Sequence, residues 1–331
     1  MYEIAKLNDI ERELIFRNTA TKMNVNEAII EKDFWIVLML DYLFNESKFK
    51  NAFAFKGGTS LSKGYSLIRR FSEDVDLILD WTFFGIPENE PYEERSNNQQ
   101  SNYNQEINKK AGAFIKNTVI SDIKIGLRDL LGYDVDLEYD QSEENIIIFR
   151  YPRLYSNEAI LNTIRLEFGP LAAWSPSEVI KVSPYINDYY PNVMNQPFTQ
   201  VLTVKPSRTF WEKATILHYE AHRPNTTKMP HRYSRHYYDL YMMSLGLPID
   251  KVLEDIDLLD KVVAFKKKFY PRGWANYDLA KRGTIKLIPE QYRIDELKKD
   301  YNTMQDMLFG DKPSFDVIMD SLRKLEEKIN S

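Results

Sequence analysis

The sequence predicts an α/β fold with a mainly helical C-terminal part. Short apolar runs typical of strands alternate with longer segments of helical spacing in roughly the first two thirds of the chain. About the last ninety residues show helical spacing only. Because a chain of 331 residues exceeds most single domains, we expect two domains, residues 1–205 and residues 206–331.

The helices expected before residue 135 follow from apolar spacing and capping. Residues 5–22 and 107–131 place apolar side chains three and four positions apart, and residues 26–44 begin at Asn26, a favourable N-cap. This last segment contains Glu31-Lys32-Asp33, a kind of charged run that usually forms a solvated helix face. Residues 87–105 are rich in Glu, Asn and Gln, and we expect a surface loop there.

The remaining elements are predicted from short apolar runs and from capping residues. Strands are expected at residues 53–55, 77–79, 135–139, 146–151 and 164–169, and before Lys205-Pro206. Residues 170–198 are rich in Pro, Tyr and Asn and are expected to be irregular. Thr209 with Glu212 suggests a capping box that opens a helix. Further helices are expected at residues 251–269, 290–309 and 314–329, the last with Ser314 as N-cap.

Composition and charge exclude several classes of protein. The chain has no Cys, which excludes disulfides and Cys-ligated metals and suits the cytoplasm. No signal peptide is visible at the N-terminus, and the longest apolar stretch, residues 34–40, is far too short to span a bilayer, so no membrane association is expected. The net charge of −5 means that any surface for nucleic acid must be local.

Residues 53–79 carry the strongest functional pattern. An apolar run ends at Lys56 and is followed by Gly57-Gly58-Thr59-Ser60, a turn that can present backbone N–H groups at the start of a helix expected at 61–69. Ser72 then precedes Asp74 and Asp76, which share one face of a strand because side chains alternate. Mg²⁺ commonly binds one or two carboxylates plus substrate phosphates. The pattern therefore predicts a Mg²⁺–nucleotide site.

These two motifs, in this order, resemble those of the AbiEii/AbiGii toxin family of nucleotidyltransferases. The matching residues are Gly57-Gly58-Thr59-Ser60-Leu61-Ser62-Lys63 and Ser72-Glu73-Asp74-Val75-Asp76-Leu77. The resemblance extends over roughly residues 27–329 and implies a nucleotidyltransferase fold with a mixed sheet flanked by helices. It also implies a phosphate-binding role for Lys56, Lys63 and the turn, and an architectural role near the active-site sheet for the Glu31-Lys32-Asp33 segment, with a substrate contact left open.

Three later segments extend the resemblance. The family pattern of a third carboxylate between apolar residues is matched by Glu167, either as a metal ligand or base, or as a surface or ion-paired residue. Glu212-Lys213 matches the third motif, which implies that Lys213 offsets phosphate charge. Arg235 and Asp239 match the fourth motif, in which His236 replaces an Asp found in many members, so the role of His236 stays open. The grouped histidines His218 and His222 are read as satisfied side chains, because no zinc-site motif accompanies them.

A local basic and aromatic segment lies between residues 266 and 286. Basic side chains alternate there with Phe, Tyr and Trp, a composition that suits phosphate contacts and base stacking, or alternatively a helix pair that balances an acidic lobe. The candidate RNA-binding residues are Lys266, Lys267, Lys268, Arg272, Lys281 and Arg282.

The sequence thus predicts an enzyme that uses Mg²⁺ and an NTP. The resemblance implies a toxin of a toxin–antitoxin or phage-defence system, with RNA such as the 3′ end of tRNA as acceptor in some relatives and a cognate antitoxin as partner. Two alternatives remain open: a nucleotidyltransferase that modifies a protein or a small molecule, and a non-catalytic nucleotide- or RNA-binding relative.

Overall fold

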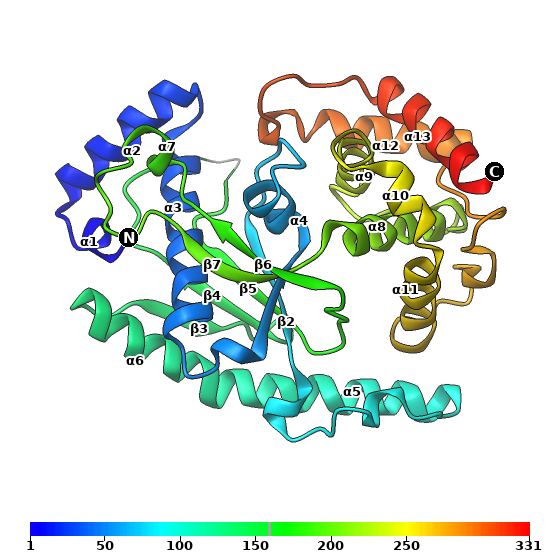
Figure 1. The fold of residues 1–331 in the computed structure, drawn as a ribbon, viewed down its shortest axis with the longest axis horizontal. Coiled ribbons are helices and arrows are strands. Elements are labelled where there is room, and N and C mark those ends of the chain that lie inside the picture. Colours follow the sequence, from blue (N-terminus) through cyan, green and yellow to red (C-terminus); the bar gives the residue numbers. More distant parts are fainter. Residues whose placement is uncertain (158–159) are drawn as a thin grey trace. The chain divides into compact units, whose positions relative to one another are not determined.

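The computed structural model describes residues 1–157 and 160–331 and divides into two compact units (Figure 1). The first unit comprises Met1–Gly64 and Glu73–Val204, and the second comprises Tyr65–Ser72 and Lys205–Ser331. The short 65–72 segment therefore interrupts the first unit in sequence while packing with the second.

The described residues of the first unit contain one mixed seven-stranded sheet, in the order β3-β4-β5-β2-β1-β7-β6. Strands β1 and β7, and strands β2 and β5, run parallel, whereas the other neighbours are antiparallel. This arrangement confirms the predicted mixed sheet flanked by helices. The strands are β1 (Phe53–Lys56), β2 (Asp74–Leu79), β3 (Asp136–Tyr139), β4 (Ile146–Arg150), β5 (Ile164–Gly169), β6 (Ser177–Val182) and β7 (Thr199–Val204).

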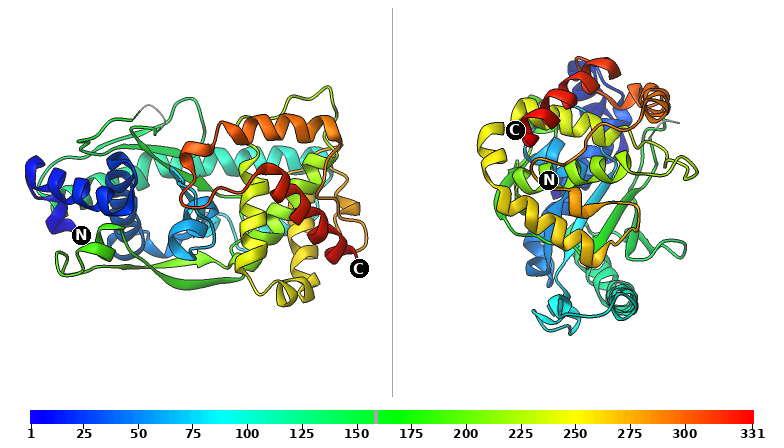
Figure 2. Two further views of the ribbon diagram at one scale, coloured as in Figure 1. Left: turned by 90° about the horizontal axis from the view of Figure 1, so that it is seen from above. Right: turned by 90° about the vertical axis from the view of Figure 1, so that its right-hand side faces the viewer.

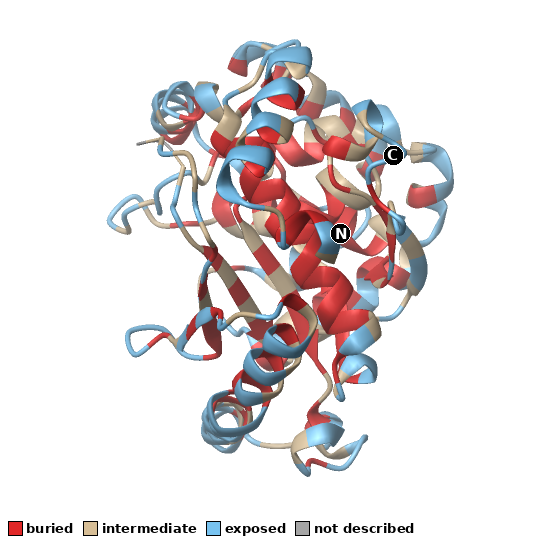
Figure 3. Ribbon diagram, turned by 90° about the vertical axis from the view of Figure 1, so that its left-hand side faces the viewer, coloured by how far each residue is buried: buried red, intermediate tan, exposed pale blue. Residues whose placement is uncertain are grey.

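The main apolar core lies between one face of this sheet and its covering helices. Strand β2 directs Val75, Leu77 and Leu79 into this core, so Asp74 and Asp76 lie on the opposite face. Every residue of α3 after Glu27 is buried, and Figure 3 shows the dense burial of the strands and the central helix. The helices of this unit are α1 (Tyr2–Ala5), α2 (Asp9–Met23), α3 (Glu27–Asp41), α4 (Gly57–Thr59), α5 (Asn97–Phe114), α6 (Ile120–Leu131) and α7 (Ile186–Tyr189).

The second unit is helical in the part of the chain described here, as the sequence predicts for its C-terminal part (Figure 2). Ser314 caps the last helix by accepting a hydrogen bond from the Val317 backbone N–H. The helices are α8 (Pro206–Ala221), α9 (Arg235–Gly246), α10 (Ile249–Glu254), α11 (Ile256–Phe269), α12 (Gln291–Asn302) and α13 (Phe315–Asn330).

The 65–72 segment is held in the second unit by backbone pairing with the chain after α12. The Phe71 N–H donates to the Met307 carbonyl at 2.8 Å, and the Phe309 N–H donates to the Arg69 carbonyl at 2.8 Å. Arg70 forms an antiparallel bridge with Leu308. The segment is thus an integral part of the second unit's structure.

Two segments expected to be irregular contain regular structure. Helix α5 begins at Asn97, where Ser96 and Gln99 form a capping box, although residues 87–105 were predicted to be loop. Strand β6, predicted as part of an irregular connection, pairs with β7 at an edge of the sheet. In both cases polar composition reflects solvent exposure of a helix or edge strand, and does not indicate the absence of regular structure.

Two predicted helix boundaries are also wrong. The helix expected at 61–69 instead begins at Gly57 as α4, continues as a π-helical turn over Ser60–Gly64 and ends there. Helix α8 begins at Pro206 with Lys205 as N-cap, so Thr209 does not open it. Proline is favourable at a first helical position because the N–H it lacks would have no helical partner there. In the described part of the chain, no helix is long and apolar enough to cross a membrane.

Candidate active site

The two N-terminal motifs meet in space at Gly57. Strand β1 pairs antiparallel with β2 and places Lys56 opposite Asp76, so the turn after β1 begins beside the second carboxylate. Gly57 has a φ of +78°, and a Cβ added to it would overlap the Asp76 carboxylate and lie 2.8 Å from the Asp76 Cβ. Glycine is required here both for its backbone conformation and for the space that Asp76 occupies.

The hydroxyl groups of the turn fasten it to its surroundings. The Thr59 hydroxyl donates to the Asp74 backbone carbonyl, and the Ser60 hydroxyl donates to the Gly57 carbonyl at 2.9 Å. Both side chains are buried. The first N–H groups of a helix lack partners within the helix, so the backbone of Gly57 and Gly58 remains the part of the turn best suited to hold phosphate oxygens.

Three carboxylates share the sheet face next to this turn. Asp74 and Asp76 alternate along β2 and are half-buried, and parallel pairing of β2 with β5 puts Glu167 in register with Asp76. Burial and the neighbouring Asp76 raise the pKa of Asp74. Burial, together with Asp76 and Asp74, raises the pKa of Glu167 to about 7. The three groups therefore form one cluster of mutually repelling negative charge that a cation would stabilise.

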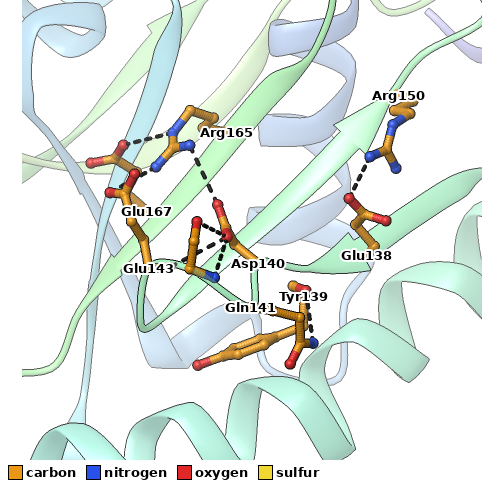
Figure 4. Close-up of polar contacts among 9 residues, drawn as sticks. Glu138, Tyr139, Asp140, Gln141, Glu143, Arg150, Arg165 and Glu167 are labelled. Carbon is orange, nitrogen blue, oxygen red and sulfur yellow. Dashed lines mark hydrogen bonds and ion pairs between the residues drawn. The ribbon is translucent and has the colours of Figure 1, made fainter.

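Arg165 partly offsets the charge of Glu167 (Figure 4). Its Nε lies 3.3 Å from Glu167 Oε1, while its terminal nitrogens lie 3.5 Å from Asp140 Oδ2 and 3.0 Å from Glu143 Oε2. Asp140 and Glu143 belong to the connection between β3 and β4. Glu167 is therefore both ion-paired and coupled to the two aspartates, and its part in metal binding stays a prediction.

The carboxylates beside the turn offer part of the ligand set that a divalent cation requires. Within residues 1–157 and 160–331, no group of three or more Asp, Glu or His side chains is arranged to hold a metal ion by itself. Asp74 and Asp76 nevertheless supply carboxylate oxygens on one face, which is the donor type that Mg²⁺ takes together with substrate phosphates. The residues thus fit a cation that arrives with its nucleotide.

The cationic residues predicted beside the turn lie in different settings. Lys63 is paired with Asp33 at 2.7 Å and lies 3.4 Å from the centre of the Tyr185 ring. Lys56 is half-buried at the end of β1, and Ser72, also half-buried, belongs to the second unit. In this structure Lys63 therefore links the π-helical turn to α3.

The predicted residues of the second unit form a buried ionic cluster. Asp239 is fully buried, with Oδ1 2.7 Å from Arg70 Nε and Oδ2 2.7 Å from Lys213 Nζ. Burial alone would raise the pKa of Asp239, but Arg70 and Lys213 beside it hold that pKa well below its usual range. The carboxylate of Asp239 is thereby kept ionised and fixes both cations.

Two further residues of the fourth motif lie at the start of α9. Arg235 is exposed. His236 packs edge-on against Tyr233, with the ring centres 4.9 Å apart, and its Nδ1 is buried without a hydrogen-bond partner among the described residues. Burial, with Lys213 and Arg235 nearby, lowers the pKa of His236, so its ring is neutral.

Comparison with known proteins agrees with this arrangement. The sequence profile of the family described as nucleotidyl transferase AbiEii toxin, type IV toxin–antitoxin system, matches residues 39–321. The chain belongs to this family. It is thus a nucleotidyltransferase toxin, and the nucleoside triphosphate and the cognate antitoxin that such a toxin requires follow from the family.

A solved structure gives independent support for the fold. The toxin is similar to MenT4, a nucleotidyltransferase toxin from Mycobacterium tuberculosis, with a TM-score of 0.53 and 15% sequence identity. The similarity covers 97% of this chain and 89% of that chain. No curated protein matches the sequence.

The predicted RNA-binding residues of the toxin lie in one region of the second unit. Lys266, Lys267 and Lys268 form the last turn of α11, and Arg272, Lys281 and Arg282 follow it in exposed connections. Lys266 Nζ donates to the Glu212 carbonyl at 2.9 Å, and Lys267 is paired with Asp278.

Sequence reasoning missed the partners that fix these motifs. Lys32 on α3 is fully buried and lies 3.2 Å from Glu73 Oε1, directly before Asp74. Arg70 lies in the gap between the two N-terminal motifs, and no local pattern pointed to Asp239 as its partner. The charged run on α3 was the one available signal, and its burial shows an architectural role and excludes a solvated face.

Proposed function

We propose that this toxin catalyses Mg²⁺-dependent transfer of a nucleotide from an NTP to a hydroxyl group of RNA, such as the 3′ end of a tRNA, with release of pyrophosphate. The observation that carries the proposal is the contact of Gly57 with Asp76, because it joins an anion-binding turn to a pair of cation-binding carboxylates. Phosphoryl transfer depends chiefly on positioning and electrostatic stabilisation, and this arrangement offers both.

Each part of the site has a role in this proposal. The backbone N–H groups of Gly57 and Gly58 would bind the β- and γ-phosphates, while Thr59 and Ser60 hold the turn in place. Asp74 and Asp76 would hold Mg²⁺, which supplies positive charge to the phosphate oxygens when bound. Glu167 would complete the carboxylate set, as a third ligand or as the base that accepts the proton of the attacking hydroxyl.

The role of the second unit stays a prediction. Lys213 and Asp239 would act at the phosphate end of the reaction, with Lys213 offsetting the charge that develops on pyrophosphate, and Arg235 would contact the nucleotide. The basic residues between 266 and 282 support RNA as the acceptor, because single-stranded RNA is bound by cationic and aromatic side chains together.

The test measures labelled nucleotide transfer. The purified toxin would be incubated with each labelled NTP, Mg²⁺ and total RNA, beside the double variant Asp74→Asn/Asp76→Asn. We expect labelled RNA with one or more NTPs, at least about a 100-fold loss in the double variant because its neutral side chains bind the cation poorly, and loss on chelation with EDTA. Asp80→Asn is the matched control, since Asp80 follows β2 and caps the next turn through Thr82, a role that Asn can keep.

Two results would overturn the proposal. Equal labelling by the wild type and the double variant would exclude Asp74 and Asp76 as the active site. Label in protein or in a small molecule, with none in RNA, would replace the acceptor while leaving the active site in place.

A further inference from the structure

The second unit contains a pocket that the proposed chemistry does not use. It has a volume of about 310 Å³ and lies among α8, the turn that precedes α9, the end of α11 and the chain that follows α11. Four of its lining residues are tyrosines, and two are cationic: Tyr219, Tyr233, Tyr270, Tyr277, Lys266 and Arg272.

The tyrosines that line the pocket offer both exposed and half-buried ring surface, on which a flat ring of a ligand could stack. Tyr270 is half-exposed at 50%, so part of its side chain faces solvent at the mouth of the pocket. Tyr219 packs against Trp274, with the ring centres 4.3 Å apart and the ring planes tilted by 35°. A flat ring that enters the pocket would find aromatic surface both at the mouth and on a wall supported from behind.

The charge of the pocket is positive. Lys266 and Arg272 line it, and no Asp or Glu among the described residues belongs to its lining. The guanidinium of Arg223 lies behind the wall, 5.1 Å from the Tyr219 ring and 4.9 Å from the Trp274 ring. Arg223 is itself ion-paired with the buried Glu220 at 2.7 Å. The positive charge offered to a ligand therefore comes from Lys266 and Arg272, which favour an anionic group beside the tyrosine rings.

The walls are anchored and do not depend on loop conformation alone. Lys266 is bonded to the Glu212 carbonyl, which ties the end of α11 to α8. The His218 ring on α8 contacts the Asn276 carbonyl through Nε2 at 3.1 Å and accepts the Lys286 N–H through Nδ1 at 2.9 Å. These bonds fix the segment that carries Tyr277 against the same helix, so the pocket is a preformed site.

We propose that this pocket binds one unstacked nucleobase of single-stranded RNA, with Arg272 and Lys266 contacting the adjacent phosphate. Base stacking on aromatic side chains contributes about 1–3 kcal/mol per base and is tolerant of sequence, and the volume lies at the small end of ligand pockets, about 300–1,000 Å³. A duplex does not fit, because its bases are stacked inside. The inference rests on the proposed RNA acceptor and adds a defined contact for it.

The test measures RNA binding without transfer. The Asp74→Asn/Asp76→Asn toxin would be titrated into a fluorescent, mixed-sequence, single-stranded 12-mer RNA. The titration would be repeated with the same RNA in a duplex. It would also be repeated with the single strand in the presence of ATP, GTP, CTP or UTP as competitor. Adding Tyr270→Ala should weaken single-strand binding about 5- to 100-fold, whereas Tyr270→Phe should keep it because the ring remains. Tyr292→Ala removes a tyrosine of similar exposure, 41%, on α12, and should change nothing.

A second variant makes the test independent of the tyrosine. Arg272→Met should weaken binding and reduce the slope of log affinity against log salt by about 0.7, the value expected for one lost phosphate contact on a single strand. Unfolding curves would show whether each variant is folded. If Tyr270→Ala does not fold, Arg272→Met still tests the inference, because Arg272 is exposed and its substitution should not affect folding.

Several results would overturn the inference. One is that both Tyr270→Ala and Arg272→Met bind the single strand as the parent does. Another is equal binding of duplex and single-stranded RNA. A third is displacement of the single strand by an NTP, which would indicate a site for a mononucleotide. These outcomes differ from a failure of the proposed function: transfer to RNA by a Tyr270→Ala toxin with unchanged RNA affinity rejects the pocket alone. Label in protein, combined with pocket-dependent RNA binding, rejects the acceptor alone.

Discussion

Gly57 shows how a single residue connects two sequence motifs. The sequence predicted that a Gly-Gly turn and an Asp-x-Asp strand would lie close together, but it did not predict that the first glycine occupies the space against Asp76. The positive φ of Gly57 also disfavours even a small side chain, such as that of Ala or Ser, at this position. The position of the second carboxylate therefore depends on the absence of a methyl group.

Gly57→Ala should therefore reduce activity more than stability. The added Cβ must displace the Asp76 side chain, and a misplacement of about 1 Å at a reacting centre can cost about 100-fold in rate. The left-handed backbone adds about 1–2 kcal/mol of strain. Nucleotide transfer and urea unfolding, measured on the same preparation, would separate the two effects.

Gly132→Ala is the control for strain alone. Gly132 has a φ of +82°, and apart from its two chain neighbours no atom of the described residues lies within 4 Å of a Cβ added there. The Gly132→Ala toxin should lose about as much free energy of unfolding as the Gly57→Ala toxin and keep its nucleotide-transfer activity. If the two variants lost activity equally, the contact with Asp76 would not position that carboxylate.

At the scale of elements, helix α3 organises the active-site strand through buried charges. Glu31 accepts the Leu154 and Tyr155 N–H groups, Lys32 pairs with Glu73, and Asp33 pairs with Lys63. The Leu161 N–H also donates to Glu73 Oε1 at 2.6 Å. A helix that is apolar on most sides thus uses three of its charged residues to hold loops and the start of β2.

Lys32→Met should be strongly destabilising. It leaves the Glu73 carboxylate buried without its lysine, and breaking a buried ion pair costs about 3–5 kcal/mol. The free energy of unfolding from urea titration would measure this loss, and Lys32→Met/Glu73→Gln should recover part of it because the uncompensated charge is gone.

Lys110→Met provides the comparison with an exposed pair. Lys110 lies 2.7 Å from Glu106 on α5, and both side chains are about half-exposed. Because both groups are solvated and screened, its loss should change the free energy of unfolding far less than Lys32→Met does. A similar small cost for Lys32→Met would show that the buried pair does not support β2.

The elements also show what sequence patterns can and cannot predict. Alternation placed Asp74 and Asp76 on one face, and helical spacing located α3 and α6, because these depend on local periodicity. The polar helix start at Asn97 and edge strand β6 were missed, since their solvent-facing residues resemble loops in composition. Pairing of Lys32 with Glu73, or of Arg70 with Asp239, joins distant positions and leaves no local pattern.

At the scale of the whole molecule, a buried histidine makes the stability of the second unit depend on pH. In the second unit His218 is buried with both ring nitrogens bonded, and burial lowers its pKa to about 4. Its pKa in the unfolded chain is about 6.5. The unfolded state therefore takes up a proton before the folded state as pH falls.

Acidification from pH 6.5 to pH 4 should accordingly lower the stability of the second unit by about 2 kcal/mol through His218. This contribution is complete above pH 6.5 and is lost as pH falls through the folded pKa near 4. Urea unfolding followed by hydrogen exchange of second-unit amides would measure it. His218→Asn should flatten this part of the profile, whereas substitution of the exposed His231 should leave it unchanged; an equal slope in both variants would contradict the assignment.

The 65–72 segment has a consequence for how such toxins can exchange parts by recombination. The chain leaves the first unit after Gly64 and re-enters it at Glu73, and in between it supplies Arg70 to Asp239. A crossover near residue 205 would therefore give a hybrid toxin in which Arg70 comes from one parent and Asp239 from the other. The ion pair between them would then have to form between segments of different origin. The two halves are therefore expected to function best when they come from one parent, although a single breakpoint near residue 205 would separate them in sequence.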